Sequence, residues 1–115
     1  MNQPDEVRIG KIKKTISQLL TYIDEHQITE DQVLSDYTIQ WTITTPLYNI
    51  GEHTYQLSKE LKALWPSVPW SQIAGMRHRL VHQYDDTNWN TIAYVIFNEL
   101  GPYLKQLDQI TEANK

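Results

Sequence analysis

The chain has 115 residues, of which 40% are hydrophobic and 21% charged, and its formal net charge is −4. This composition suits one folded domain over residues 1–115 with a single core, and it excludes a disordered chain. The acidic balance argues against a protein that coats nucleic acid non-specifically, but it leaves room for a local basic site. No cysteine is present, which excludes disulfides and thiolate metal sites.

The sequence carries no sign of a membrane span or a targeting segment. No apolar run approaches the roughly 18 residues that a spanning helix needs. Residues 1–6 lack the basic and apolar regions of a signal peptide. We therefore expect a cytoplasmic protein.

Apolar residues recur at steps of three and four, which predicts amphipathic helices. The first helix is expected over about 5–26. A capping-box pattern from Thr29 to Gln32 starts a short helix or turn. A second helix is expected over about 37–63, with a kink or break at Pro46, because proline lacks a backbone donor.

Two further helices complete the expected fold. After a loop at 65–69, the third runs over about 70–83, with an apolar side that includes Leu80 and Val81. The fourth runs over about 89–111 and is kinked at Gly101 and Pro102. We therefore predict an all-α fold, a small antiparallel four-helix bundle with an additional short helix and a kinked second helix. Most tryptophans and tyrosines fall on apolar faces and are expected in the core rather than as stacking platforms for bases.

The end of the third predicted helix concentrates two arginines, two histidines and a tyrosine: Arg77, His78, Arg79, His82 and Tyr84. Arginine always carries charge and binds phosphate. Histidine can donate and accept protons near neutral pH. Arg77 and His82 are five residues apart, about 140° around a helix, a gap that the long arginine side chain can close. The two side chains can therefore converge on one phosphate.

This pair suits cleavage of RNA without a metal or other cofactor. A base removes the 2′-OH proton, the oxygen attacks the adjacent phosphorus, and an acid protonates the leaving 5′-oxygen. His82 suits one of the proton transfers. Arg77 suits stabilisation of the charge that develops on the phosphoryl oxygens. The product would be a 2′,3′-cyclic phosphate, and DNA would be spared.

Two other readings of the cluster stay open from spacing alone. The polar residues can form a solvated helix face, as most charged runs do. Alternatively, His78, His82 and either Asp85 or Asp86 have the spacing of two imidazoles and a carboxylate around a metal. His26 and His53 stand alone in the sequence and are expected at the surface or between helices.

The flanks of the cluster complete a longer pattern. It comprises the following residues: Pro69, Trp70, Ile73, Gly75, Met76, Arg77, Leu80, Val81, His82 and Tyr84. A second pattern, Ile50-Gly51-Glu52, precedes Leu57 and Ser58. Together they closely resemble the HepT-like branch of the HEPN superfamily, over about residues 9–110.

The resemblance implies an all-α homodimer whose Arg-x4-His motifs face each other across the subunit interface. It also implies an endoribonuclease toxin of a type VII-like toxin–antitoxin module. The antitoxin would be an MntA-like nucleotidyltransferase that transfers AMP to Tyr84. Mapped by position, Arg77 and His82 are the catalytic pair, and Tyr84 is the modification site. His78 and Arg79 are candidate supporting contacts to RNA.

The chain departs from the family pattern in the second predicted helix. Residues 40–49 replace a stretch that usually carries an arginine, with Thr45 at about that position, and His53 replaces an alanine. Two other function classes stay open, the first motivated by these departures and by the acidic net charge, the second by the solvated-face reading of the cluster. One is a catalytically silent HEPN module that binds RNA or a nucleotidyltransferase. The other is a structural helical adaptor.

Overall fold

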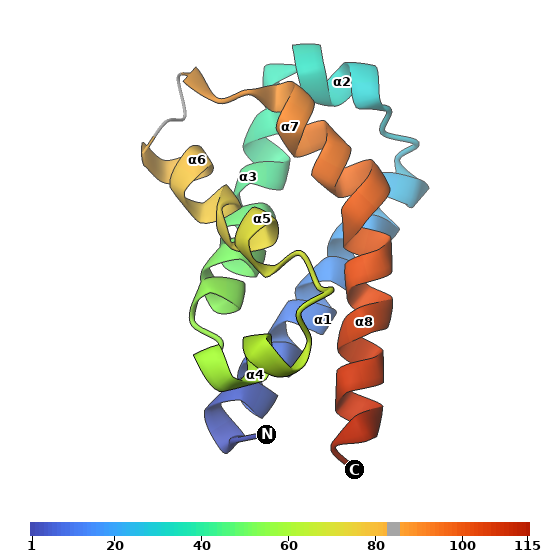
Figure 1. Cartoon of the computed structure of the whole chain (residues 1–115). Coiled ribbons are helices and arrows are strands. Elements are labelled where there is room, and N and C mark those ends of the chain that lie inside the picture. Colours follow the sequence, from blue (N-terminus) through green and yellow to red (C-terminus); the bar gives the residue numbers. More distant parts are fainter. Residues whose placement is uncertain (83–85) are drawn as a thin grey trace.

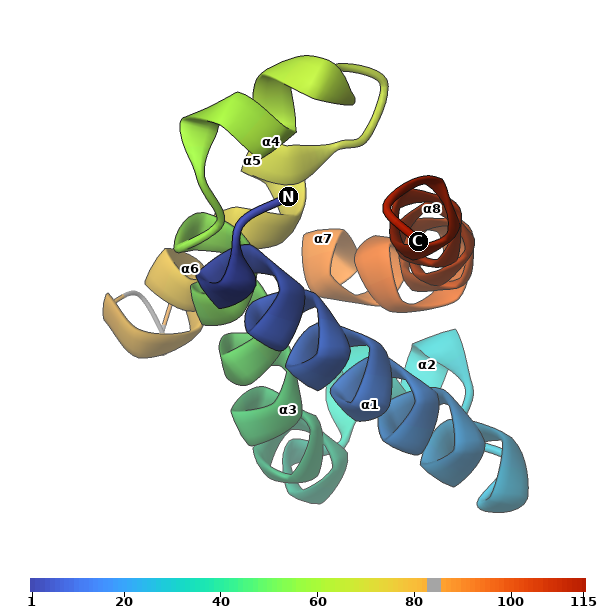
Figure 2. The same cartoon turned by 90° about the horizontal axis from the view of Figure 1, so that it is seen from below.

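The computed structural model describes residues 1–82 and 86–115, with only the backbone of His82, and this part of the chain is all-α (Figure 1). Three long helices form the frame: α1 (Gln3–Glu25), α3 (Tyr37–Tyr55) and α8 (Leu100–Ala113). The shorter elements are α2 (Glu30–Ser35), α4 (Lys59–Leu64), α5 (Trp70–Ala74), α6 (Met76–His82), α7 (Trp89–Tyr94) and a π-helical segment, η2 (Val95–Glu99). Seen from below, α1 lies between α3 and α8 (Figure 2), and it packs against both.

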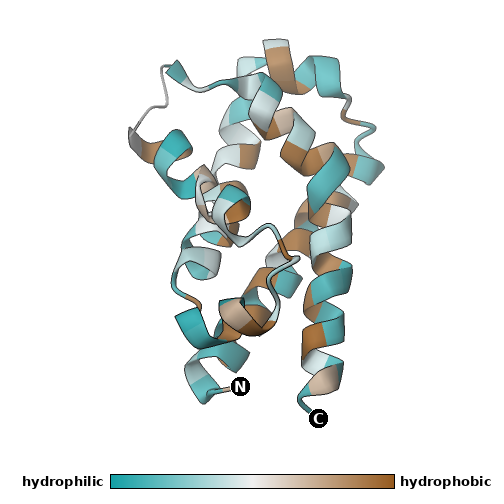
Figure 3. Ribbon diagram, in the orientation of Figure 1, coloured by the Kyte–Doolittle hydropathy of each residue, from teal (hydrophilic) through white to brown (hydrophobic). Residues whose placement is uncertain are grey.

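Aliphatic side chains from the three long helices and from the shorter elements form the core. Figure 3 shows apolar positions on the inward side of α8, with polar residues on its outer side. Members of this core that are fully shielded from solvent include Ile12, Ile16, Ile43, Leu47, Ile50, Leu100 and Leu107. Burying a side chain of this size contributes about 1.5–3 kcal/mol, so the long helices supply a large share of the driving force for folding.

The first two helical predictions are confirmed. α1 begins at Gln3, where Asn2 caps it by accepting a hydrogen bond from the Asp5 amide at 2.8 Å. The capping box of α2 is complete. The Gln32 amide donates to Thr29 Oγ1 at 3.2 Å, and the Thr29 amide donates to Gln32 Oε1 at 2.9 Å.

The second helix differs from the prediction in where it is interrupted. No break occurs at Pro46, through which α3 continues to Tyr55. Pro46 removes only the hydrogen bond to the carbonyl of Thr42, an exposed residue that water can reach. The interruption lies at residues 56–58 instead. There the Asp5 carboxylate accepts hydrogen bonds from the amide and hydroxyl of Ser58, which caps α4.

The third and fourth helices are also less regular than expected. The third divides at Gly75 into α5 and α6, and Val81, predicted to be in the core, is 52% exposed. The fourth changes direction between α7 and α8 (Figure 1), where η2 lies just before Gly101 and Pro102. The Leu100 amide donates to the carbonyl of Val95, five residues back, so a π-type turn accommodates the predicted kink.

Two buried polar contacts join elements that are distant in sequence. Asp5, 3% exposed, ties the start of α1 to the start of α4 through Ser58. The hydroxyls of Thr54 on α3 and Tyr103 on α8 lie 2.7 Å apart, and both residues are fully buried. This burial raises the pKa of Tyr103 well above its usual range. Within the described part of the chain, every helix is too short or too polar to span a lipid bilayer.

Candidate active site on α6

α6 packs against the C-terminal half of α3 through a very close approach at Gly51. A Cβ atom built on Gly51 would lie 2.9 Å from the Arg77 amide nitrogen and 3.2 Å from the Ile73 carbonyl oxygen. Both neighbours are backbone atoms, which cannot move aside as a flexible side chain could. Glycine at position 51 therefore allows the backbone of Arg77 to lie directly against α3.

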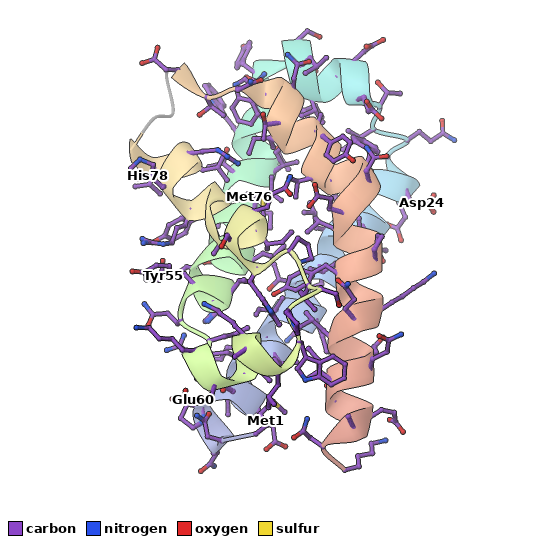
Figure 4. All side chains as sticks on the ribbon, in the orientation of Figure 1. Met1, Asp24, Tyr55, Glu60, Met76 and His78 are labelled. Carbon is purple, nitrogen blue, oxygen red and sulfur yellow. The ribbon has the colours of Figure 1, made fainter. Side chains whose placement is uncertain are left out.

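The side chain of Arg77 rests on two residues of α3. Its guanidinium carbon lies 3.7 Å from the centroid of the Tyr55 ring, and its Nε lies 3.7 Å from Glu52 Oε2. Figure 4 shows the labelled Tyr55 on the same side of the molecule as His78 of α6. The Arg77 and Glu52 side chains are 30% and 31% exposed, so water reaches both of them in part.

This arrangement orients Arg77 without using up its hydrogen-bonding capacity. A cation over an aromatic ring gains about 0.5–1 kcal/mol at a partly exposed site. The guanidinium has five N–H donors in a fixed fork, and the contact with Glu52 involves only Nε. No residue of the described chain accepts a hydrogen bond from the two terminal nitrogens of Arg77. A phosphate can therefore bind to Arg77 while Tyr55 holds the guanidinium plane.

Arg77 and His78 line one pocket with a volume of about 380 Å³. The other lining residues come from the end of α3, from α4 and from α5: Tyr55, Lys62, Trp70, Ser71, Ala74 and Gly75. The predicted supporting residue Arg79 is not among them. Its Nη1 is buried and has no hydrogen-bond partner within the described part of the chain.

Part of the predicted site lies outside the described residues. This applies to the His82 side chain and to Tyr84 and Asp85, so their positions relative to Arg77 stay predictions. α6 does extend as far as His82, which keeps Arg77 and His82 on one helix. The metal alternative depends on these same residues. Among the described residues, no group of three or more His, Cys, Asp and Glu side chains could hold a metal.

Sequence reasoning missed three residues of this site, two that contact Arg77 and one that lines the same pocket. Glu52 appears in the sequence only as part of the Ile50-Gly51-Glu52 pattern, the tyrosines as a group are expected in the core, and nothing singles out Lys62. Tyr55 and Glu52 lie three residues apart on α3, a spacing that puts both on one side of a helix. Nothing in the sequence says that this side meets Arg77, because that contact depends on how α3 and α6 pack.

The expected burial of the aromatic residues is wrong for several of them. Tyr37, Trp41 and Tyr94 are 61%, 63% and 55% exposed, and Tyr55 is 51% exposed. Tyr37 and Trp41 pack edge to face at 4.8 Å near the start of α3. A three- or four-residue periodicity identifies an apolar face of a helix. It does not show whether another element of the fold covers that face.

His53 is expected at the surface or between helices, and the structure places it between α3 and α1. Its Nδ1 lies 3.2 Å from Nη1 of Arg8 on α1. Arginine can only donate, so Nδ1 must accept, which requires the neutral form of the ring. Burial and the neighbouring charges of Arg8 and Lys11 lower the pKa of His53 below its ordinary value, and Glu52 opposes them in part.

Comparison with known proteins places the chain among ribonuclease-like relatives. A family model described as "Ribonuclease HepT-like" matches residues 9–110. A protein named "Putative RNase" from Caldanaerobacter subterraneus subsp. tengcongensis is 32% identical over 88 residues, which cover 76% of this chain and 79% of the relative. "Probable ribonuclease HepT" from Thermococcus cleftensis is 29% identical over 96 residues, which cover 78% and 87%. No solved structure matches the chain.

Proposed function

Because the chain belongs to the ribonuclease HepT-like family, we propose that it is a metal-independent endoribonuclease and the toxin of a toxin–antitoxin pair. The names of its relatives support a role in RNA cleavage. The observation that carries the proposal is the setting of Arg77. Its guanidinium is stacked on Tyr55, oriented by Glu52 and directed to a pocket.

In the proposed reaction, Arg77 binds the phosphoryl oxygens of the scissile phosphate. His82 removes the proton from the 2′-OH or donates one to the 5′-oxygen that leaves. The 2′-oxygen forms a bond to phosphorus as the bond to the 5′-oxygen breaks. Arg77 stabilises the extra negative charge on the phosphoryl oxygens, a role in which a preoriented cation is most effective. One histidine can perform only one of these proton transfers at a time.

The second proton transfer gives a reason for a homodimer. In the arrangement that we propose, two Arg-x4-His motifs face each other, and the partner's motif supplies the second acid or base. The exposed position of Val81 on α6, 52% accessible in one chain, is consistent with a covered surface there in a dimer. A monomeric enzyme with full activity would contradict this arrangement.

We also propose that an MntA-like nucleotidyltransferase controls the enzyme by adenylylating Tyr84. Tyr84 is two residues from His82, so an added AMP would bring bulk and negative charge next to the imidazole. Such a group would repel the substrate phosphate, as other charge-adding modifications do. The measurement is the intact mass of the protein purified with and without the nucleotidyltransferase. A gain in multiples of one AMP on the Tyr84 peptide is expected, and an unmodified Tyr84 in neutralised cells would contradict it.

The test of the proposed activity is cleavage of single-stranded RNA by the purified protein in EDTA. We expect products with 2′,3′-cyclic phosphate ends and no cleavage of DNA of the same sequence. The Arg77→Ala and His82→Ala proteins should cleave RNA about 10²–10⁴ times more slowly than the wild type while remaining folded. A strict metal requirement would favour the metal reading that includes His78 and His82. Binding of RNA without cleavage would favour the silent HEPN module.

A further inference from the structure

Lys62 reaches the pocket of Arg77 from a different element of the fold. Lys62 lies on α4 and Arg77 on α6, and both line the pocket. Both cations also lie over the same ring. The Lys62 ammonium is 6.0 Å and the Arg77 guanidinium carbon is 3.7 Å from the centroid of Tyr55. The Tyr55 ring therefore lies near two positively charged side chains, Lys62 and Arg77.

The charge of Lys62 is poorly compensated by its surroundings. Its Nζ donates a hydrogen bond to the Tyr55 carbonyl oxygen at 3.1 Å, which leaves two of its three donors for another partner. Within the described part of the chain, no carboxylate lies at ion-pair distance from Lys62, whereas Lys13 contacts Asp108 at 2.7 Å. Partial burial lowers the pKa of Lys62, and the nearby charge of Asp5 offsets this only in part. An anionic ligand would stabilise such an ammonium.

The walls of the pocket suit a nucleotide. Trp70 is 7% exposed and its indole nitrogen is already bonded to the Trp65 carbonyl at 2.9 Å, so it contributes apolar surface. Ala74 and Gly75 add more apolar lining, and Ser71 adds a hydroxyl. Single-stranded RNA is commonly held by cations on its phosphates and by aromatic side chains against its bases. A volume of about 380 Å³ is within the usual range for a small-ligand pocket.

We propose that Lys62 binds an RNA phosphate next to the one that Arg77 contacts. The pocket between α4, α5 and α6 then holds one nucleotide of the substrate beside the cleavage position. This inference rests on the proposed ribonuclease function and adds a substrate contact that lies outside the Arg-x4-His motif. It also gives α4 a role in fixing where the RNA strand enters the site.

The test compares Lys62→Gln with Lys59→Gln for binding to single-stranded 2′-O-methyl RNA, which lacks the attacking hydroxyl. Lys59 is on the same helix and exposed, but it does not line the pocket, so its substitution removes the same charge elsewhere. We expect Lys62→Gln to weaken binding about fivefold at moderate salt and to reduce the salt slope by about 0.7, the value for one lost phosphate contact on a single strand. Lys59→Gln should change neither quantity appreciably.

Two further measurements make the result decisive. Lys62→Arg keeps the charge and should bind like the wild type, and Lys62→Gln should unfold at the wild-type temperature, which together separate loss of a phosphate contact from loss of folding. With cleavable RNA, Lys62→Gln should raise KM more than it lowers kcat. Equal effects of Lys62→Gln and Lys59→Gln on RNA binding, or no effect of either, would overturn the inference. Cleavage of RNA by the wild-type protein would still support the proposed function in that case. A wild-type protein that neither binds nor cleaves RNA would overturn both.

Discussion

The long-helix frame and the region of α4 to α6 are built on different principles. The frame of α1, α3 and α8 is held by fully buried aliphatic side chains. The region of α4 to α6 consists of helices of five to seven residues. They also bury side chains in this core, Ile73 and Met76 among them, but they add a close backbone approach and partly exposed cations. The first region determines the fold, and the second carries the candidate chemistry. α3 belongs to both, since one side packs in the core and its last turn holds Arg77.

The largest expected effect comes from removing the predicted catalytic groups. His82→Ala and Arg77→Ala should each lower kcat by about 10²–10⁴, the range for loss of acid–base or charge-stabilising groups. Arg77→Ala also removes the contacts with Tyr55 and Glu52, so its free energy of unfolding should fall by about 0.5–1 kcal/mol. Single-turnover cleavage and urea unfolding measure the two quantities. A variant that keeps wild-type activity would remove its residue from the mechanism.

Gly51→Ala should lower both the stability of the long-helix frame and the activity of the candidate site. The added methyl would press on the backbone at Arg77 and Ile73, which we expect to cost about 1–3 kcal/mol of stability. Cleavage should also fall, through displacement of Arg77. Gly10→Ala is the matched control. Its Cβ would meet nothing within 4 Å, so it should stabilise α1 by about 0.4–1 kcal/mol and leave cleavage unchanged.

The frame alone should respond to loss of the hydroxyl pair between α3 and α8. Tyr103→Phe leaves the buried Thr54 hydroxyl without its partner and should cost about 1–2 kcal/mol. The double variant Thr54→Val, Tyr103→Phe removes both polar groups and should be less destabilised than the sum of the single variants. Thermal or urea unfolding gives these values. Strict additivity would show that the two hydroxyls do not depend on each other.

The smallest expected effect is a pH dependence at His53, where the frame meets the edge of the site. The folded protein holds the pKa of His53 below its ordinary value of 6.5, so the unfolded chain binds the proton first as the pH falls. Stability should therefore decrease as the pH drops from about 7 to about 5, and His53→Gln should flatten this part of the curve. Urea unfolding across this range tests the sign. A wild-type curve that rises toward acid pH would contradict it.

The sequence predicts the frame well because periodicity and caps act locally. The extent of α1 and the capping box from Thr29 to Gln32 follow from residues that are close together in the chain. The interruption at Ser58 does not, because it depends on Asp5, which is distant in sequence. For the same reason, Arg77 could be selected from its motif, but its support by Glu52 and Tyr55 could not. Those contacts arise from packing between helices.

The close approach at Gly51 also bears on how the protein opens and closes locally. Short helices such as α5 and α6 would ordinarily fray on their own, and their amide protons would exchange with solvent quickly. Here the amide nitrogen of Arg77 lies directly against the backbone of α3. We expect the amide protons of Arg77 and Gly51 to exchange with solvent at the same rate, because α6 and the C-terminal half of α3 open as one cooperative unit. The arginine would then be released only when a core helix opens.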